Sequence, residues 1–249
     1  MVRETVLAAV VAGLIAALVF TVVQSVWITP LIHQGEVYEE AAEHSHAEAH
    51  EHHADAHADA HEGAHEAGGH HHDDDEWKPE DGWQRTLFTF GANLLMGVGY
   101  AFVLVALYLL WREPRNALAG GVYGLAGFLV FFAAPAVGLP PDLPGTAAAE
   151  LSVRQQWWAM TAVATAVGLF LLFSQSRWSL RILGILIVIA PHFVPAPQPA
   201  VESSLAPAEL QTQFRVATTI ANAVFWVALG IASGVAFRKL VAGGSRAQA

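Results

Sequence analysis

Six long apolar runs are the feature that most constrains this chain of 249 residues. A transmembrane helix needs about 20 mostly apolar residues to cross the ~30 Å hydrocarbon core of a bilayer. The runs are continuous and rich in Leu, Ala and Val, whereas the strands of a membrane β-barrel alternate apolar and polar residues. The chain is 54% hydrophobic and 14% charged, a composition unlike that of a soluble domain. We therefore predict an all-α integral membrane protein, a bundle of about six transmembrane helices.

The fifth run is the shortest, because only thirteen residues separate Arg181 from Pro195. It is either a short span or a re-entrant segment. We divide the chain into a first transmembrane helix (1–28), a loop (29–86), a bundle of about five spans (87–237) and a tail (238–249). The predicted spans are Thr5–Ile28, Leu87–Trp111, Ala117–Ala136, Trp157–Phe173, Leu180–Val194 and Val216–Phe237.

Positive charges predict the orientation of these spans. With six spans, eight of the twelve Lys and Arg lie on the side of the two termini, and 20 of the 22 acidic residues lie on the other. Short cytoplasmic segments carry an excess of Lys and Arg. Both termini are therefore expected in the cytoplasm, and the 29–86 loop outside it. The first run is longer than a usual signal-peptide core and lacks a small-residue cleavage site, so we expect it to be retained.

The loop is rich in histidine and acid: twelve of the 13 histidines lie between His33 and His72. Its repetitive polar composition predicts disorder. Imidazole with carboxylate suits divalent Co, Ni and Zn, so we expect weak capture of such ions rather than a merely solvated acidic spacer. The expected ligands are His44, His46, His50, His52, His53, His57, His61, His65, His70, His71 and His72.

Other functions are disfavoured by the sequence. The net charge of −10 argues against nucleic-acid binding, and the absence of cysteine excludes thiolate metal sites. The match of His61–His65 to the H-E-x-x-H protease pattern is expected by chance in a tract of His, Glu and Ala. There is no phosphate-binding loop pattern, so we predict no ATP hydrolysis. The predicted spans contain almost no ionisable residues, so we predict no other enzymatic activity either.

Polar residues within spans are costly and therefore candidates for function. Gln24, Asn93 and Asn222 are such residues, and we expect their amide oxygens to line the transport path through the bundle, although hydrogen bonding between helices also explains them. At the outer ends of the spans we expect four further metal ligands, namely His33, Glu36, Asp142 and His192. The pairs Gly120-x-x-x-Gly124 and Gly230-x-x-x-Gly234 predict close helix packing.

Several peptides together resemble one family. They include PLIHQGEVYE (30–39), DGWQRT (81–86), GLPPDLPG (138–145), RQQWW (154–158) and PH (191–192) followed by APQP (196–199). This combination resembles the predicted cobalt-transporter subunit CbtA family over essentially the whole chain outside the histidine tract. The resemblance implies a bacterial inner-membrane protein linked to cobalamin-dependent cobalt uptake. It also implies a small, single-span, histidine-bearing CbtB partner.

Residues and resemblance together predict uptake of a divalent transition metal. The ligand types fit Co, Ni and Zn alike, and the resemblance favours cobalt. One alternative is a membrane-anchored metal-binding accessory or sensor that delivers ions to another permease. A second is a membrane enzyme or assembly factor whose loop stores metal. Membrane lipid is the expected surrounding, and the sequence leaves an oligomer, the direction of transport and the energy source open.

Overall fold

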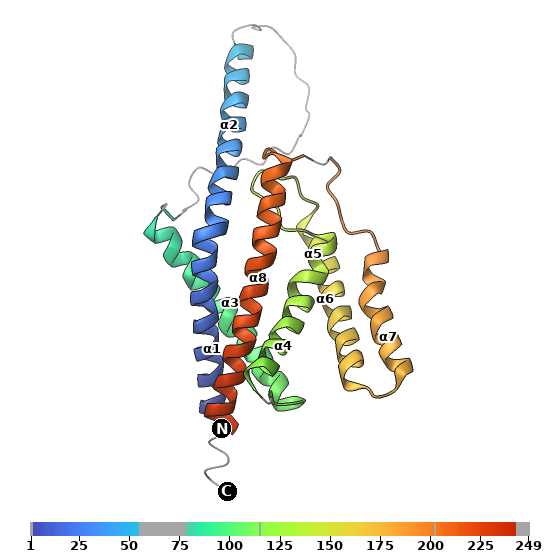
Figure 1. Cartoon of the computed structure of the whole chain (residues 1–249). Coiled ribbons are helices and arrows are strands. Elements are labelled where there is room, and N and C mark those ends of the chain that lie inside the picture. The colour runs from blue at the N-terminus through green and yellow to red at the C-terminus, as the bar shows by residue number, and fades with distance from the viewer. Residues whose placement is uncertain (1, 55–78, 81, 115, 202, 243–249) are drawn as a thin grey trace.

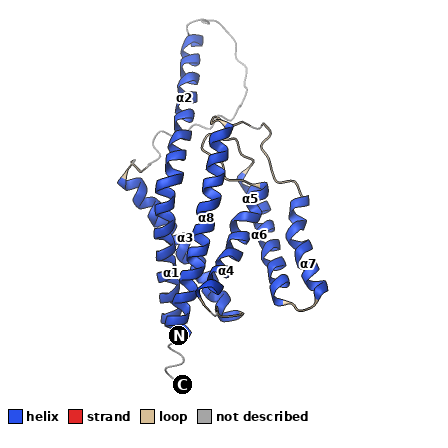
Figure 2. Ribbon diagram, in the orientation of Figure 1, coloured by secondary structure: helices blue, strands red, loops and turns tan. Residues whose placement is uncertain are grey.

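The computed structural model describes residues 2–54, 79–80, 82–114, 116–201 and 203–242, and every regular element within them is a helix. Figures 1 and 2 show these helices side by side in one bundle. The predicted all-α membrane protein is confirmed. Five helices are long and apolar enough to span a bilayer, namely Val2–Ala42, Trp83–Leu110, Ala117–Gly138, Leu151–Ser174 and Ala208–Val241.

The predicted fifth span is a helix, and it is short. Helix α7 (Trp178–Ile189) continues into a 3-10 turn, η3 (Ala190–Phe193). At 1.5 Å per residue the two together reach about 24 Å, which is less than the ~30 Å core. Helix α7 packs against α6 (Leu151–Ser174), where Gly168 and Gly184 let the two backbones approach closely. Within the described residues, the bundle thus has five full-length apolar helices and a sixth that is shorter.

The first helix extends far beyond the predicted span. Helix α1 (Val2–Val23), a π-helical turn η1 (Gln24–Ile28) and α2 (Thr29–Ala54) form one continuous rod (Figure 1). We predicted a loop from residue 29, and its first part is helical instead. The stretch from 36 to 54 contains no Gly or Pro and is rich in Ala and Glu, which are strong helix formers. The rest of the histidine loop, 55–78, lies outside the described residues.

Two π-helical turns precede prolines in the same way. Turn η1 is followed by Thr29 and Pro30, and η2 (Leu129–Ala133) is followed by Ala134 and Pro135. In each case the residue before the proline donates its N–H to a carbonyl five residues back. Proline has no N–H, and its ring crowds the carbonyl four residues back. The wider π turn therefore lets each helix continue past its proline, from α1 into α2 and from α4 (Ala117–Phe128) into α5 (Ala134–Gly138).

Small residues form the centre of the bundle, where α1, α3 (Trp83–Leu110), α4 and α8 (Ala208–Ala236) meet. Ala8, Ala12 and Ala16 repeat every fourth residue of α1 and are fully buried. Between α4 and α8 the backbones touch at Gly124 and Gly230. The predicted close packing at the two glycine pairs is confirmed. Such contacts hold membrane helices together because lipid tails supply no hydrophobic force between helices.

The start of α1 contacts η4 (Phe237–Ala242), the turn that ends α8, so the described chain begins and ends at one end of the bundle. The opposite end carries α2 (Figure 1). This arrangement is what six passes require. That the first of these ends faces the cytoplasm stays a prediction.

Substituting Gly124 by alanine is expected to destabilise the bundle by about 1–3 kcal/mol, because the core has no room for a methyl group. A Cβ on Gly124 would lie 3.0 Å from Gly230 Cα and closer still to Trp226 O. Gly99→Ala is the matched control, since nothing lies within 4 Å of a Cβ there. Thermal unfolding in detergent measures both variants. Equal melting temperatures would contradict the contact.

Candidate functional site

A polar pocket of about 370 Å³ lies between the first helical rod and the start of α3. Its lining combines an imidazole, a guanidinium, an amide and four hydroxyls, with apolar Ile28 and Ile32. The π turn η1 supplies part of the lining, and such turns are frequent at functional sites. The polar residues of the pocket are Gln24, Ser25, Thr29, His33, Arg85, Thr86 and Thr89.

Three charged or titratable side chains form a chain of contacts at this pocket. Arg85 donates from its two terminal nitrogens to Glu36, at 2.6 Å to Oε1 and 3.3 Å to Oε2. His33 Nδ1 lies 2.9 Å from Glu36 Oε2. His33 and Glu36 are three residues apart on α2 and so share one face of the helix. The structure therefore brings two predicted ligands together and adds an arginine that the sequence reasoning did not include.

Deeper in the bundle, Asn93 of α3 contacts the first helical rod. Its amide nitrogen donates to Gln24 Oε1 at 2.5 Å and to Thr21 Oγ1 at 2.9 Å. Asn93 is only 6% exposed, so this is a buried polar contact within a predicted span. Gln24 also lines the pocket above, and it thereby connects the buried amide to the pocket. Two of the three predicted path residues thus belong to one site.

The third, Asn222, is placed differently. Its amide nitrogen donates to the carbonyl of Thr218, one turn earlier in α8, at 2.9 Å. Among the described residues, that is the one hydrogen bond of its side chain. Asn222 therefore does not join the Gln24–Asn93 contact.

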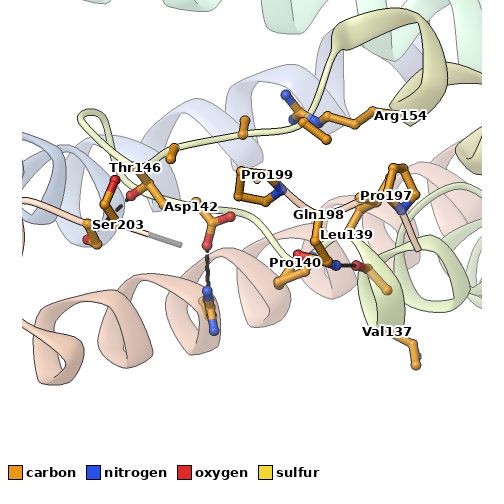
Figure 3. A pocket seen from close by; sticks show the side chains of 16 residues that line it. Val137, Leu139, Pro140, Asp142, Thr146, Arg154, Pro197, Gln198, Pro199 and Ser203 are labelled. Atoms are coloured by element: carbon orange, nitrogen blue, oxygen red, sulfur yellow. Dashed lines mark hydrogen bonds and ion pairs between the residues drawn. The ribbon is translucent and has the colours of Figure 1, made fainter. Parts of the chain in front are cut away.

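A second polar pocket, of about 570 Å³, lies between the 137–149 and 197–204 segments (Figure 3). Asp142 lines it, and its Oδ1 accepts from Arg215 of α8 at 2.6 Å and 3.2 Å. Arg154, Gln198, Pro197 and Pro199 complete much of the wall. Asp142 is therefore in an ion pair, in a pocket other than the one that holds His33.

Gln211 of α8 fixes these turns. It is buried, its Oε1 accepts from the Leu143 N–H at 3.2 Å, and its Nε2 donates to Thr146 and Ser204. Gln211→Leu should cost about 1–3 kcal/mol, because it leaves buried polar groups without partners. Thermal unfolding and limited proteolysis of the 139–147 turn report the loss. Gln213→Leu, on the exposed side of α8, is the control, and equal losses would contradict the role of Gln211.

His192 lies in η3, at the end of α7. Its ring meets the Trp157 ring of α6 edge to face, with centroids 6.2 Å apart. Its Nδ1 is buried and has no hydrogen-bond partner among the described residues. His192 is therefore positioned by the α6–α7 pair, whereas His33 is positioned by the first helical rod.

The predicted outer ligands thus occupy three places. In the described part of the chain no group of three or more His, Asp and Glu side chains is close enough to hold a metal ion. Helix α2 includes five of the tract histidines, whose side chains are not described: His44, His46, His50, His52 and His53. His57, His61, His65, His70, His71 and His72 lie outside the described residues.

Sequence reasoning missed Arg85, Thr21 and Gln211. For Arg85 a signal existed, since it is one of only four Lys and Arg on the acid-rich side of the predicted topology. Thr21 and Gln211 carry no such signal. A threonine in an apolar run, or one of two neighbouring glutamines, becomes distinctive only when its helix neighbours are known.

The long apolar helices and their buried polar contacts define the class: this is a multi-pass, all-α membrane protein. A family model described as "Probable cobalt transporter subunit (CbtA)" matches residues 2–238. The chain therefore belongs to the CbtA family, as its peptides indicated. This is a transporter-subunit family and not an enzyme family, and the word subunit implies a partner. Neither the comparison with curated proteins nor that with solved structures found a match.

Proposed function

We propose that this protein carries a divalent transition metal, cobalt in particular, into the cell. In this proposal the histidine tract collects the ion outside the membrane and the His33 pocket receives it. The observation that supports this most directly is the position of the pocket. His33 lines its wall, Gln24 lines it too, and Gln24 contacts the buried Asn93.

The length of this polar series suits a route into the bilayer. From His33 to Thr21 is twelve residues along one helical rod, or about 18 Å, which is over half the ~30 Å hydrocarbon core. In this proposal the metal binds first to the imidazole of His33 and then to neutral amide and hydroxyl oxygens deeper in the bundle, none of which holds it tightly. Asp142, paired with Arg215, and His192, beside Trp157, lie on other elements, and we assign them no place on this route.

The membrane potential is sufficient to drive such entry. At −100 mV it supplies about 2.3 kcal/mol per elementary charge, hence roughly twice that for a divalent ion. No phosphate-binding loop pattern occurs in the sequence, so ATP hydrolysis is not assigned to this chain. The partner implied by the family description is proposed to be a small, histidine-bearing, single-span CbtB-like subunit.

Flux into proteoliposomes tests the function. With an inside-negative potential, the purified protein should give saturable Co²⁺ entry that excess Mg²⁺ does not inhibit. Empty liposomes and liposomes with collapsed potential are the controls. Absence of flux for Co²⁺, Ni²⁺ and Zn²⁺, with binding that disappears when the tract is removed, would instead support the accessory protein that delivers ions to another permease. Adding the partner subunit then tells whether it is needed.

A further inference from the structure

We propose that Glu36 and Arg85 position His33 and do not bind the ion themselves, so that His33 offers its Nε2 atom to the pocket as the metal ligand. The inference rests on the proposed function, because it concerns the site that receives the metal. It replaces the sequence-based expectation that both His33 and Glu36 are ligands. Three contacts carry it: two from Arg85 to the Glu36 carboxylate, and one from that carboxylate to His33 Nδ1.

The contacts determine which nitrogen of His33 carries the hydrogen. Both carboxylate oxygens of Glu36 accept from Arg85, so the group is an ionised acceptor. His33 Nδ1, 2.9 Å from Oε2, must then be the donor. A neutral imidazole protonated at Nδ1 has its free lone pair at Nε2. His33 lines the pocket, and within the described residues its side-chain hydrogen bond is the one from Nδ1 to Glu36, which leaves Nε2 available.

This arrangement is the one that metal-binding histidines use. They usually donate their other ring N–H to a carboxylate, which fixes the tautomer and makes the ligating nitrogen more basic. Here Arg85 holds the carboxylate in turn, with a planar fork that matches its geometry. The helical spacing of His33 and Glu36 keeps the two on one face, and Arg85 comes from the first turn of α3. The orientation of the His33 ring therefore depends on the contact between Glu36 of α2 and Arg85 of α3.

The same arrangement favours transition metals over hard cations. Mg²⁺ and Ca²⁺ prefer carboxylate oxygens, and the oxygens of Glu36 are already engaged by a cationic side chain. Co²⁺, Ni²⁺ and Zn²⁺ bind imidazole well, and Nε2 is the atom left available. Arg85 therefore influences selectivity indirectly, because it occupies the Glu36 carboxylate and leaves His33 Nε2 as the available ligand.

Histidine nitrogen NMR tests the tautomer without any metal. The sample is the full-length chain with the eleven tract histidines replaced by glutamine, which leaves His33 and His192, and the His33→Ala spectrum assigns the signals. We expect the Nδ1–H form of His33 to predominate, and Glu36→Ala to convert it to a mixture with the Nε2–H form. Glu40→Ala, on the exposed side of α2, should change nothing. An Nε2–H form in the parent chain, or no effect of Glu36→Ala, overturns the proposal.

Equilibrium Co²⁺ binding to the same chain, followed by titration calorimetry and visible absorption, separates a positioning role from direct ligation. His33→Ala should abolish the site. Glu36→Ala should weaken it about 10–100-fold, as loss of a ligand-orienting partner does. Arg85→Lys, which keeps the charge but loses the fork, should weaken it about threefold to tenfold. Unchanged binding in His33→Ala, or abolished binding in Glu36→Ala with unchanged binding in Arg85→Lys, overturns it. Neither measurement uses transport, so failure of cobalt uptake leaves both results standing.

Discussion

Replacing Asn93 by leucine is expected to slow cobalt entry into proteoliposomes about tenfold to a hundredfold while the protein stays folded. Asn93 is buried and holds the Gln24 amide by a 2.5 Å hydrogen bond at the inner end of the polar pocket. A hydrogen bond or ligand contact to a charged group is worth about 1.5–3 kcal/mol, and that difference in a barrier corresponds to the expected loss of rate. Leucine has the same branching at Cγ but carries two methyl groups and no oxygen, so the ion meets an apolar barrier.

Two matched variants separate this role from helix packing. Thr21→Val removes one hydroxyl of the proposed route and a hydrogen-bond acceptor of Asn93 but leaves both amides, so it should lower the melting temperature and slow transport less than Asn93→Leu does. Asn222→Leu removes an amide that bonds within its own helix, so transport should remain within about threefold of the parent. Loss of transport in Asn222→Leu with retention in Asn93→Leu would place the route along α8 instead.

Replacing the eleven tract histidines by glutamine is expected to raise the cobalt concentration for half-maximal entry about tenfold or more, with the maximal rate unchanged. A dense set of charges and ligands near an entrance raises the local ion concentration by such factors. The tract adds imidazole, which suits Co, Ni and Zn, to that negative charge. At saturating cobalt the capture step no longer limits the rate, so the variant and the parent should be equal.

The control for this prediction replaces the acidic residues of the tract by amides and leaves the histidines. It should change the cobalt affinity less than the histidine variant does, and its effect should disappear at high salt, which screens charge but not coordination. Lowering the pH should raise the half-saturation concentration of the parent more than that of the histidine variant, since the tract imidazoles bind metal only in their neutral form. An unchanged half-saturation concentration in the histidine variant would show that the tract does not capture cobalt and is only a solvated spacer.

Much of the fold was predictable because the bilayer restricts the choices. Long apolar runs must be helices, and small residues spaced by four predict close contacts, as Gly124 and Gly230 confirm. The fifth apolar run, the shortest of the six, is a short helix because Pro191 and the proline-rich segment after it end the helical pattern. The extension of α2 was missed because its polar composition was interpreted as disorder, although its Ala and Glu favour helix locally.

The candidate site was only partly predictable. Gln24, Asn93, His33 and Glu36 were identified because polar or titratable groups in and beside apolar runs are conspicuous. Their partners were not, because a side-chain pair depends on which helix faces join. The Asp142–Arg215 ion pair joins residues 73 positions apart, and it removes Asp142 from the predicted cluster. No spacing pattern within the sequence contains that information.

The sequence by itself determined that this chain is a multi-pass helical membrane protein of a metal-transporter family, because apolar length and distinctive peptides are local properties. It also determined which few residues are polar enough to interact with an ion. Only the tertiary structure decided that Gln24 meets Asn93, that Arg85 holds Glu36 against His33, and that His192 lies apart beside Trp157. The reason is physical: the route of an ion depends on distances of a few ångströms between different helices, and these follow from how the small-residue faces pack.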